Sequence, residues 1–113
     1  MANEQPHDQL ISQETIHQVV QRIAQAFSPQ KIILIGSYAS GHPSSDGDLD
    51  LLVVMPTNLP QHKRAVPLHL LFRPKPCAMD ILVYTPQEVA YWQGTVNHII
   101  TEALSSGKVV YEG

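Results

Sequence analysis

The hydrophobic pattern of this chain begins with one helical face. That face consists of Ile16, Val19, Val20, Ile23 and Phe27. Ser12 is placed to cap the helix, and Ser28-Pro29 is placed to end it. Residues 1–10 show no hydrophobic period, so we expect a flexible polar lead-in there. A single domain is then expected over residues 11–113.

Short apolar runs follow, and they are typical of buried strands. They are Lys31–Ile35, Leu49–Val54 and Met79–Tyr84. The stretch SYASGHPSSDGD separates the first two runs and is too long for a tight hairpin, so it predicts a loop. The sequence KVVY near the end of the chain is compatible with a short strand or an extended tail.

Helical patterns occupy the spaces between and after these strands. Residues 61–72 have helix-compatible apolar spacing, but Pro67 bends or interrupts a helix, so a lid, an interface and a bent helix all stay open. Thr85, Pro86 and Glu88 supply a cap, a first-turn proline and a capping-box acid, which predict a helix start. A last helical face is predicted from Val96, Ile99, Ile100 and Leu104, with Gly107 ending the helix.

Composition limits the number of domains, the class of protein and the expected cellular location. The 113 residues fit one domain, 43% of them are hydrophobic, and no apolar run approaches the roughly 18 residues of a membrane span. The first residues lack the basic and apolar segments of a secretory signal. Cys77 is the only cysteine, so an internal disulfide is impossible and a cytoplasmic location is expected. Seven basic residues, mostly scattered, against ten acidic ones argue against a nucleic-acid-binding face.

Three aspartates lie at the entries to two predicted strands. Asp48 and Asp50 are two positions apart, so their side chains share a face, and Asp80 enters the next strand in the same way. An isolated Asp-x-Asp is common, and Asp80 alone is typical of a turn or a cap. Together, carboxylates at the mouths of buried strands favour a divalent cation that offsets their charge.

Gly36-Ser37 directly follows the first strand, where backbone amides and a hydroxyl can hold a phosphate. A turn glycine followed by a capping serine is the alternative interpretation. A Walker-type phosphate loop is excluded because no Gly-Lys-Ser or Gly-Lys-Thr follows.

Other candidate sites are weaker. Asp46 and the two aspartates after it imitate the start of an EF-hand loop, but Leu51 and Thr57 stand where glycine and glutamate are required. Cys77 is interpreted as a small core residue rather than a nucleophile. His42, in the loop before the aspartates, is the histidine to follow.

The spacing of these motifs resembles the minimal nucleotidyltransferase (MNT) family of the DNA polymerase beta superfamily. Gly36-Ser37 is followed after ten residues by Asp48-x-Asp50, and then by Asp80 between apolar residues. The segments KIILIGSYASG, GDLDLLVV, AMDILVYTPQEV and GKVVYEG carry the resemblance. Ser40 and Gly47 depart from the family's usual arginine and serine. The resemblance implies an α/β (α+β) nucleotidyltransferase fold, a small mixed β-sheet with helices packed on it.

The resemblance also implies a two-metal mechanism with ATP as substrate. Asp48 and Asp50 would hold two Mg²⁺ ions, and Asp80 would bind the second ion and accept the proton of the acceptor hydroxyl. Ser37 and the amides around Gly36 would position the triphosphate. The sequence does not distinguish ATP from other nucleoside triphosphates.

Stand-alone members of this family resemble the antitoxin of HEPN/MNT toxin-antitoxin pairs. The implied function is transfer of AMP from ATP to a tyrosine of the partner, a HEPN-domain ribonuclease toxin. Two alternatives stay open: an antitoxin that only binds its toxin, and a transferase acting on a small molecule. No membrane partner is expected, and a homo- or hetero-oligomer is compatible with the sequence.

Overall fold

A mixed four-stranded sheet organises the protein. The computed structural model describes residues 10–43 and 47–113, so the predicted lead-in lies outside the described residues except for Leu10. The sheet has the order β3-β2-β1-β4, with β1 antiparallel to β2 and β4, and β2 parallel to β3. The predicted α/β (α+β) class is confirmed. The strands are β1 (Lys31–Ile35), β2 (Leu49–Val54), β3 (Met79–Tyr84) and β4 (Lys108–Glu112).

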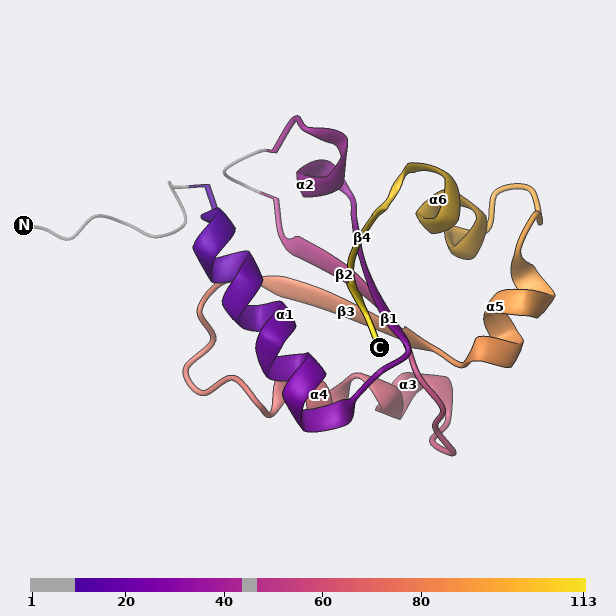
Figure 1. Cartoon of the computed structure of the whole chain (residues 1–113), viewed down its shortest axis with the longest axis horizontal. Coiled ribbons are helices and arrows are strands. Elements are labelled where there is room, and N and C mark those ends of the chain that lie inside the picture. Colours follow the sequence, from indigo (N-terminus) through magenta and orange to yellow (C-terminus); the bar gives the residue numbers. More distant parts are fainter. Residues whose placement is uncertain (1–9, 44–46) are drawn as a thin grey trace, which may run out of the picture.

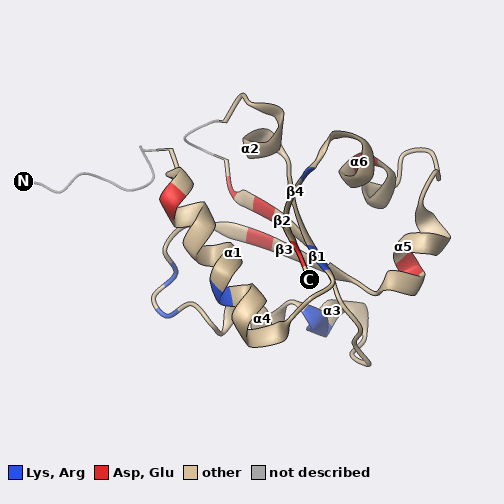
Figure 2. Ribbon diagram, in the orientation of Figure 1, with Lys and Arg blue, Asp and Glu red and all other residues tan. Residues whose placement is uncertain are grey.

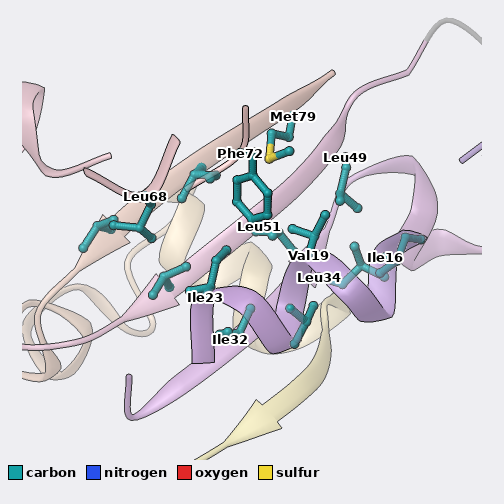
Figure 3. Close-up of a cluster of buried hydrophobic side chains, with 14 of the residues drawn as sticks. Ile16, Val19, Ile23, Ile32, Leu34, Leu49, Leu51, Leu68, Phe72 and Met79 are labelled. Carbon is teal, nitrogen blue, oxygen red and sulfur yellow. The ribbon is translucent and has the colours of Figure 1, made fainter. Parts of the chain in front are cut away.

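Helix α1 (Gln13–Phe27) covers one face of the sheet, as its periodicity predicts. It begins after Ser12, whose hydroxyl accepts a hydrogen bond of 3.1 Å from the Thr15 amide. Figure 3 shows the buried side chains of α1 meeting those of β1, β2 and β3 in the main core. Labelled members of this core are Ile16, Val19, Ile23, Ile32, Leu34, Leu49, Leu51, Leu68, Phe72 and Met79.

The opposite face carries α5 (Pro86–Trp92) and α6 (Ile99–Ser106). Figure 1 shows α1 and α6 separated by the strands. The predicted capping box of α5 is confirmed, with Thr85 and Glu88 exchanging hydrogen bonds of 3.1 and 2.9 Å.

The predicted apolar face of the last helix is wrong in part. Val96 precedes α6 and is 81% exposed, and Leu104 is 43% exposed, whereas Ile100 and Ala103 are buried against the sheet. Spacing alone therefore identified Ile99 and Ile100 correctly but included two exposed residues and missed Ala103. The predicted end at Gly107 is confirmed, since its amide bonds the Ala103 carbonyl at 3.0 Å.

Two connections between strands differ from the loop and the helical segment that the sequence suggests. The stretch after β1 contains one helical turn, α2 (Ser37–Ser40), where a loop was expected. Residues 61–72 form two short helices, α3 (Gln61–Arg64) and α4 (Val66–His69). The break falls just before Pro67, which lies in the first turn of α4, because proline lacks the amide that a continuous helix needs. The terminal KVVY forms part of strand β4 rather than a tail.

Within residues 10–43 and 47–113, no helix has the length and apolar character needed to cross a membrane.

Candidate active site

The sheet brings two of the predicted acids side by side. In the parallel pairing of β2 with β3, Asp50 is the register partner of Asp80. Register partners in a sheet point to the same face and lie close together. Asp48 immediately precedes β2 and is exposed. Figure 2 shows the acidic positions of β2 and β3 on adjacent strands.

Asp50 and Asp80 lie on the sheet face that α6 covers. Alternation along β2 turns Leu49 and Leu51 toward α1, where both are fully buried, and it turns Asp50 and Leu52 the other way. Leu52 packs with Ile100 in a second, smaller core. The α6 face of the sheet is therefore apolar along its length and acidic at one end.

Gly36 gives the Asp50 carboxylate its space. Gly36 has φ +77° and ψ −155°, a conformation that side-chain-bearing residues rarely adopt. A Cβ atom built on it would overlap Oδ2 of Asp50 and lie 3.3 Å from Cγ. The turn after β1 therefore requires glycine at this position for two reasons. Its backbone angles are unfavourable for other residues, and a side chain would overlap the Asp50 carboxylate.

The charge of Asp50 is not offset by its surroundings. Burial raises the pKa of Asp50 above its usual value, and the neighbouring Asp80 and then Asp48 raise it further. Asp80 and Asp48 are therefore near enough to repel the carboxylate of Asp50. Among the residues that the structure describes, no three His, Cys, Asp or Glu side chains are grouped closely enough to hold a metal ion. The sheet itself brings together the pair Asp50 and Asp80, with Asp48 exposed beside it.

A cavity of about 430 Å³ opens between this acidic end of the sheet and α6. Its sheet side includes Gly36, Asp50 and Asp80, as the sequence predicts for a site. Asp48 and the half-buried Ser37, the first residue of α2, are not part of its described lining. The full lining is Ile35, Gly36, Ser40, Asp50, Asp80, Leu82, Ile99, Glu102, Ala103, Ser106 and Gly107.

Sequence reasoning did not identify the α6 side of this cavity. Glu102 and Ser106 line it together with Ile99, at intervals of three or four residues that place them on one helical face. That spacing was visible in the sequence, but only the fold shows that this face meets the acids. Ser40, noted in the sequence for replacing an arginine, also lines the cavity.

Two other candidates from the sequence lie outside this lining. Cys77 is half-buried and packs against the main core, and burial followed by the charge of Asp48 raises the pKa of its thiol. A raised pKa disfavours the nucleophilic thiolate. His42 is exposed, and Asp46, from the rejected EF-hand interpretation, lies outside the described residues.

Comparisons with known proteins identify the family of the chain and its fold. The family model described as a nucleotidyltransferase domain matches residues 16–105. A crystal structure of a candidate nucleotidyltransferase from Sulfolobus solfataricus superposes with a TM-score of 0.61. That match has 16% sequence identity and covers 88% of this chain and 78% of the other, so it shows a common fold. No curated protein sequence matches this chain.

Proposed function

This chain belongs to the nucleotidyltransferase domain family, and from that premise we propose that it transfers AMP from ATP to a hydroxyl group of a partner protein, with Mg²⁺. The observation that carries the proposal is the pairing of Asp50 with Asp80 beneath the cavity, beside Gly36. Acids at the mouth of a cleft, next to a glycine turn after a strand, suit transfer of a phosphorylated group.

The donor groups fit a hard divalent cation. Asp50 is half-buried, its pKa is raised, and the described lining of the cavity contains no basic side chain that would balance its charge. Carboxylate oxygens are preferred ligands of Mg²⁺. Asp50 and Asp80 would hold the metal, and Asp48 would join them by turning its exposed side chain. The bound ions would supply charge neutralisation of the triphosphate and a lower pKa for the acceptor hydroxyl.

The residues of the chain then have separate roles. The amides around Gly36 and the Ser37 hydroxyl orient the triphosphate. The acceptor oxygen attacks the α-phosphorus, and the bond from that phosphorus to the bridging oxygen of the β-phosphate breaks, releasing pyrophosphate. The acceptor proton passes to a carboxylate oxygen of Asp80. The α6 wall limits access of water to the cavity from one side.

The resemblance to MNT proteins supports a more specific role. We propose that the acceptor is a tyrosine of a HEPN-domain ribonuclease toxin and that the chain is its antitoxin. In this proposal the described residues supply one four-stranded sheet with its helices and cavity, and the partner protein supplies the acceptor hydroxyl.

One observation favours a second candidate, an antitoxin that binds its toxin without modifying it. Ser40 lines the cavity at the position where the family resemblance leads us to expect an arginine. A triphosphate in this cavity therefore lacks a cationic contact from α2, which weakens ATP binding by the chain alone.

Intact-protein mass spectrometry of the HEPN partner separates the two candidates. The partner is incubated with ATP, Mg²⁺ and the wild-type chain, Asp50→Asn, or Glu14→Gln, an exposed acid on α1 that serves as the matched control. Transfer predicts a gain of about 329 Da per AMP with wild type and Glu14→Gln, and none with Asp50→Asn or without Mg²⁺. A stable complex without any mass gain would instead identify a binding antitoxin.

A further inference from the structure

Helix α6 adds a carboxylate to the cavity wall that faces the sheet. The α6 residues in the lining are Ile99, Glu102, Ala103 and Ser106. Glu102 is the charged member of this face, it is exposed, and it lies across the cavity from Asp50 and Asp80. It also lies in the first turn of α6, where a negative charge is favourable to the helix dipole. Stabilisation of α6 alone is therefore the alternative role of Glu102, and the experiment has to distinguish it from ligand binding.

The proposed metal site uses the acids of the sheet side, Asp48, Asp50 and Asp80, and leaves Glu102 on α6 for another role. The described lining lacks Lys, Arg and His. Glu102 therefore acts on whatever enters the cavity, repelling anionic groups and attracting cationic ones. The triphosphate is anionic and is repelled by Glu102, whereas a cationic group on the acceptor is attracted to it.

We infer that Glu102 selects the acceptor by binding an ammonium or guanidinium group on the molecule that carries the acceptor hydroxyl. This inference rests on the proposed function, because it concerns the second substrate of the same cavity. A lysine or arginine beside a hydroxyl-bearing residue of a protein provides this chemistry, and so does an amino sugar. Glu102 contacts the cationic group and not the reacting atoms, so it determines specificity.

Binding of small probes tests the inference without knowledge of the natural acceptor. The ¹⁵N-labelled full chain is saturated with Mg²⁺ and an ATP analogue whose α,β-methylene bridge prevents transfer. Capped peptides Lys-Tyr-Lys, Ser-Tyr-Ser and Glu-Tyr-Glu, and the amino sugar kanamycin, are then titrated while the amide signals of Ala103 and Ser106 are followed. The lysine peptide is expected to bind about two- to fivefold more tightly than the serine peptide. The glutamate peptide is expected to bind most weakly.

Variants of Glu102 distinguish selection from helix stabilisation. Glu102→Gln should bind the lysine and serine peptides equally, Glu102→Lys should reverse the order, and Glu102→Asp should retain it. Glu14→Gln removes the corresponding first-turn acid of α1 and should leave the order unchanged. A helix-stabilising role alone would lower the melting temperature of Glu102→Gln but leave its order of peptide affinities as in wild type.

The outcomes separate the inference from the proposed function. Binding of the lysine peptide that depends on Glu102 identifies a protein as a source of the cation, and binding of kanamycin that depends on Glu102 identifies a small molecule; either result supports the inference. Equal affinities for the three peptides without Glu102-dependent binding of kanamycin, or preferences that survive in Glu102→Gln, overturn it. Binding of the ATP analogue with Mg²⁺ is measured beforehand, and its failure counts against the proposed function instead.

Discussion

The carboxylate of Asp50 lies directly against Gly36, so the acidic site is in contact with the turn after β1. The two residues come from antiparallel neighbours, since Ile35, just before Gly36, is the register partner of Asp50. Any atom added at Gly36 displaces the carboxylate. The conformation of the turn and the position of the acid are therefore coupled.

Gly36→Ala is predicted to abolish AMP transfer and to destabilise the protein by roughly 1–3 kcal/mol. The new methyl group would overlap Oδ2 of Asp50, and alanine is strained at φ +77°. Transfer is measured by the mass gain of the partner, and stability by urea denaturation.

Gly41→Ala is the matched control for this change. Gly41 also has a positive φ, +85°, but a Cβ atom there has no neighbour within 4 Å. The control should cost about 1 kcal/mol of stability and retain transfer. Equal loss of transfer in the two variants would contradict a specific role for the contact between Gly36 and Asp50.

Asp50→Asn is predicted to stabilise the metal-free protein while abolishing transfer. Burial and the charges of Asp80 and Asp48 disfavour an ionised Asp50, and asparagine removes that cost. The expected gain in the free energy of unfolding is roughly 1 kcal/mol, the size of one like-charge contact under near-aqueous screening. Thermal unfolding at neutral pH in EDTA measures it. Asp48→Asn, at the exposed acid, should change stability less.

The pH dependence of this gain has a definite sign. Because the folded-state pKa of Asp50 is raised, the wild type loses stability as pH rises from its ordinary pKa of 3.8 through the raised value. Below that window Asp50 is protonated in both states, so the two proteins should converge in stability. A gain that stays constant down to low pH would contradict the electrostatic origin.

The sequence predicts those features that depend on neighbours in the chain. Ser12 and the Thr85–Glu88 capping box mark the starts of α1 and α5 through local hydrogen bonds, and Pro67 breaks its helix by its own geometry. The aspartates at the strand entries could be identified in the same way, because they adjoin apolar runs in the sequence. Their roles as metal ligands stay predictions.

Features that depend on long-range packing were not predictable in the same way. The register that pairs Asp50 with Asp80 is set between strands separated by α3 and α4. The placement of Glu102 opposite them depends on which face of α6 meets the sheet. Apolar spacing gave that face only in part, because Ala103 is buried while the larger Leu104 is exposed.

Glu88→Gln is predicted to destabilise the protein by about 1–3 kcal/mol, because it removes charged hydrogen bonds to a buried arginine. Both guanidinium amino groups of Arg64 donate to the Glu88 carboxylate, at 2.7 and 3.1 Å, and the Arg64 side chain is only 10% exposed. Urea denaturation at neutral pH measures the loss. Glu112→Gln is the control, since its ion pair with Lys31 spans 3.6 Å at the surface and should contribute far less.

Acid should produce a similar loss in the wild type. The hydrogen bond from Arg64, the backbone hydrogen bond from Thr85 and the arginine's charge hold the pKa of Glu88 below its usual 4.5. The stabilisation is therefore present above pH 4.5 and lost as pH falls through the depressed folded-state value. Glu88→Gln should lack this part of the acid transition. An identical acid profile in wild type and variant would contradict the assignment.

Gly107→Ala is predicted to destabilise the protein by about 1–3 kcal/mol and to lower AMP transfer, for steric reasons alone. Its φ of −80° suits any residue, but a Cβ atom would lie 2.5 Å from the Ala103 carbonyl oxygen and 2.6 Å from Cγ2 of Ile33. Because Gly107 also lines the cavity, separating α6 from β1 moves the wall that carries Glu102. Urea denaturation and the partner's mass gain measure the two effects.

Leu104→Ala is the control for this prediction, since Leu104 lies on the exposed side of α6, and it should change stability and transfer far less. Equal losses in the two variants would show that general destabilisation of the helix, and not the close contact at Gly107, is responsible.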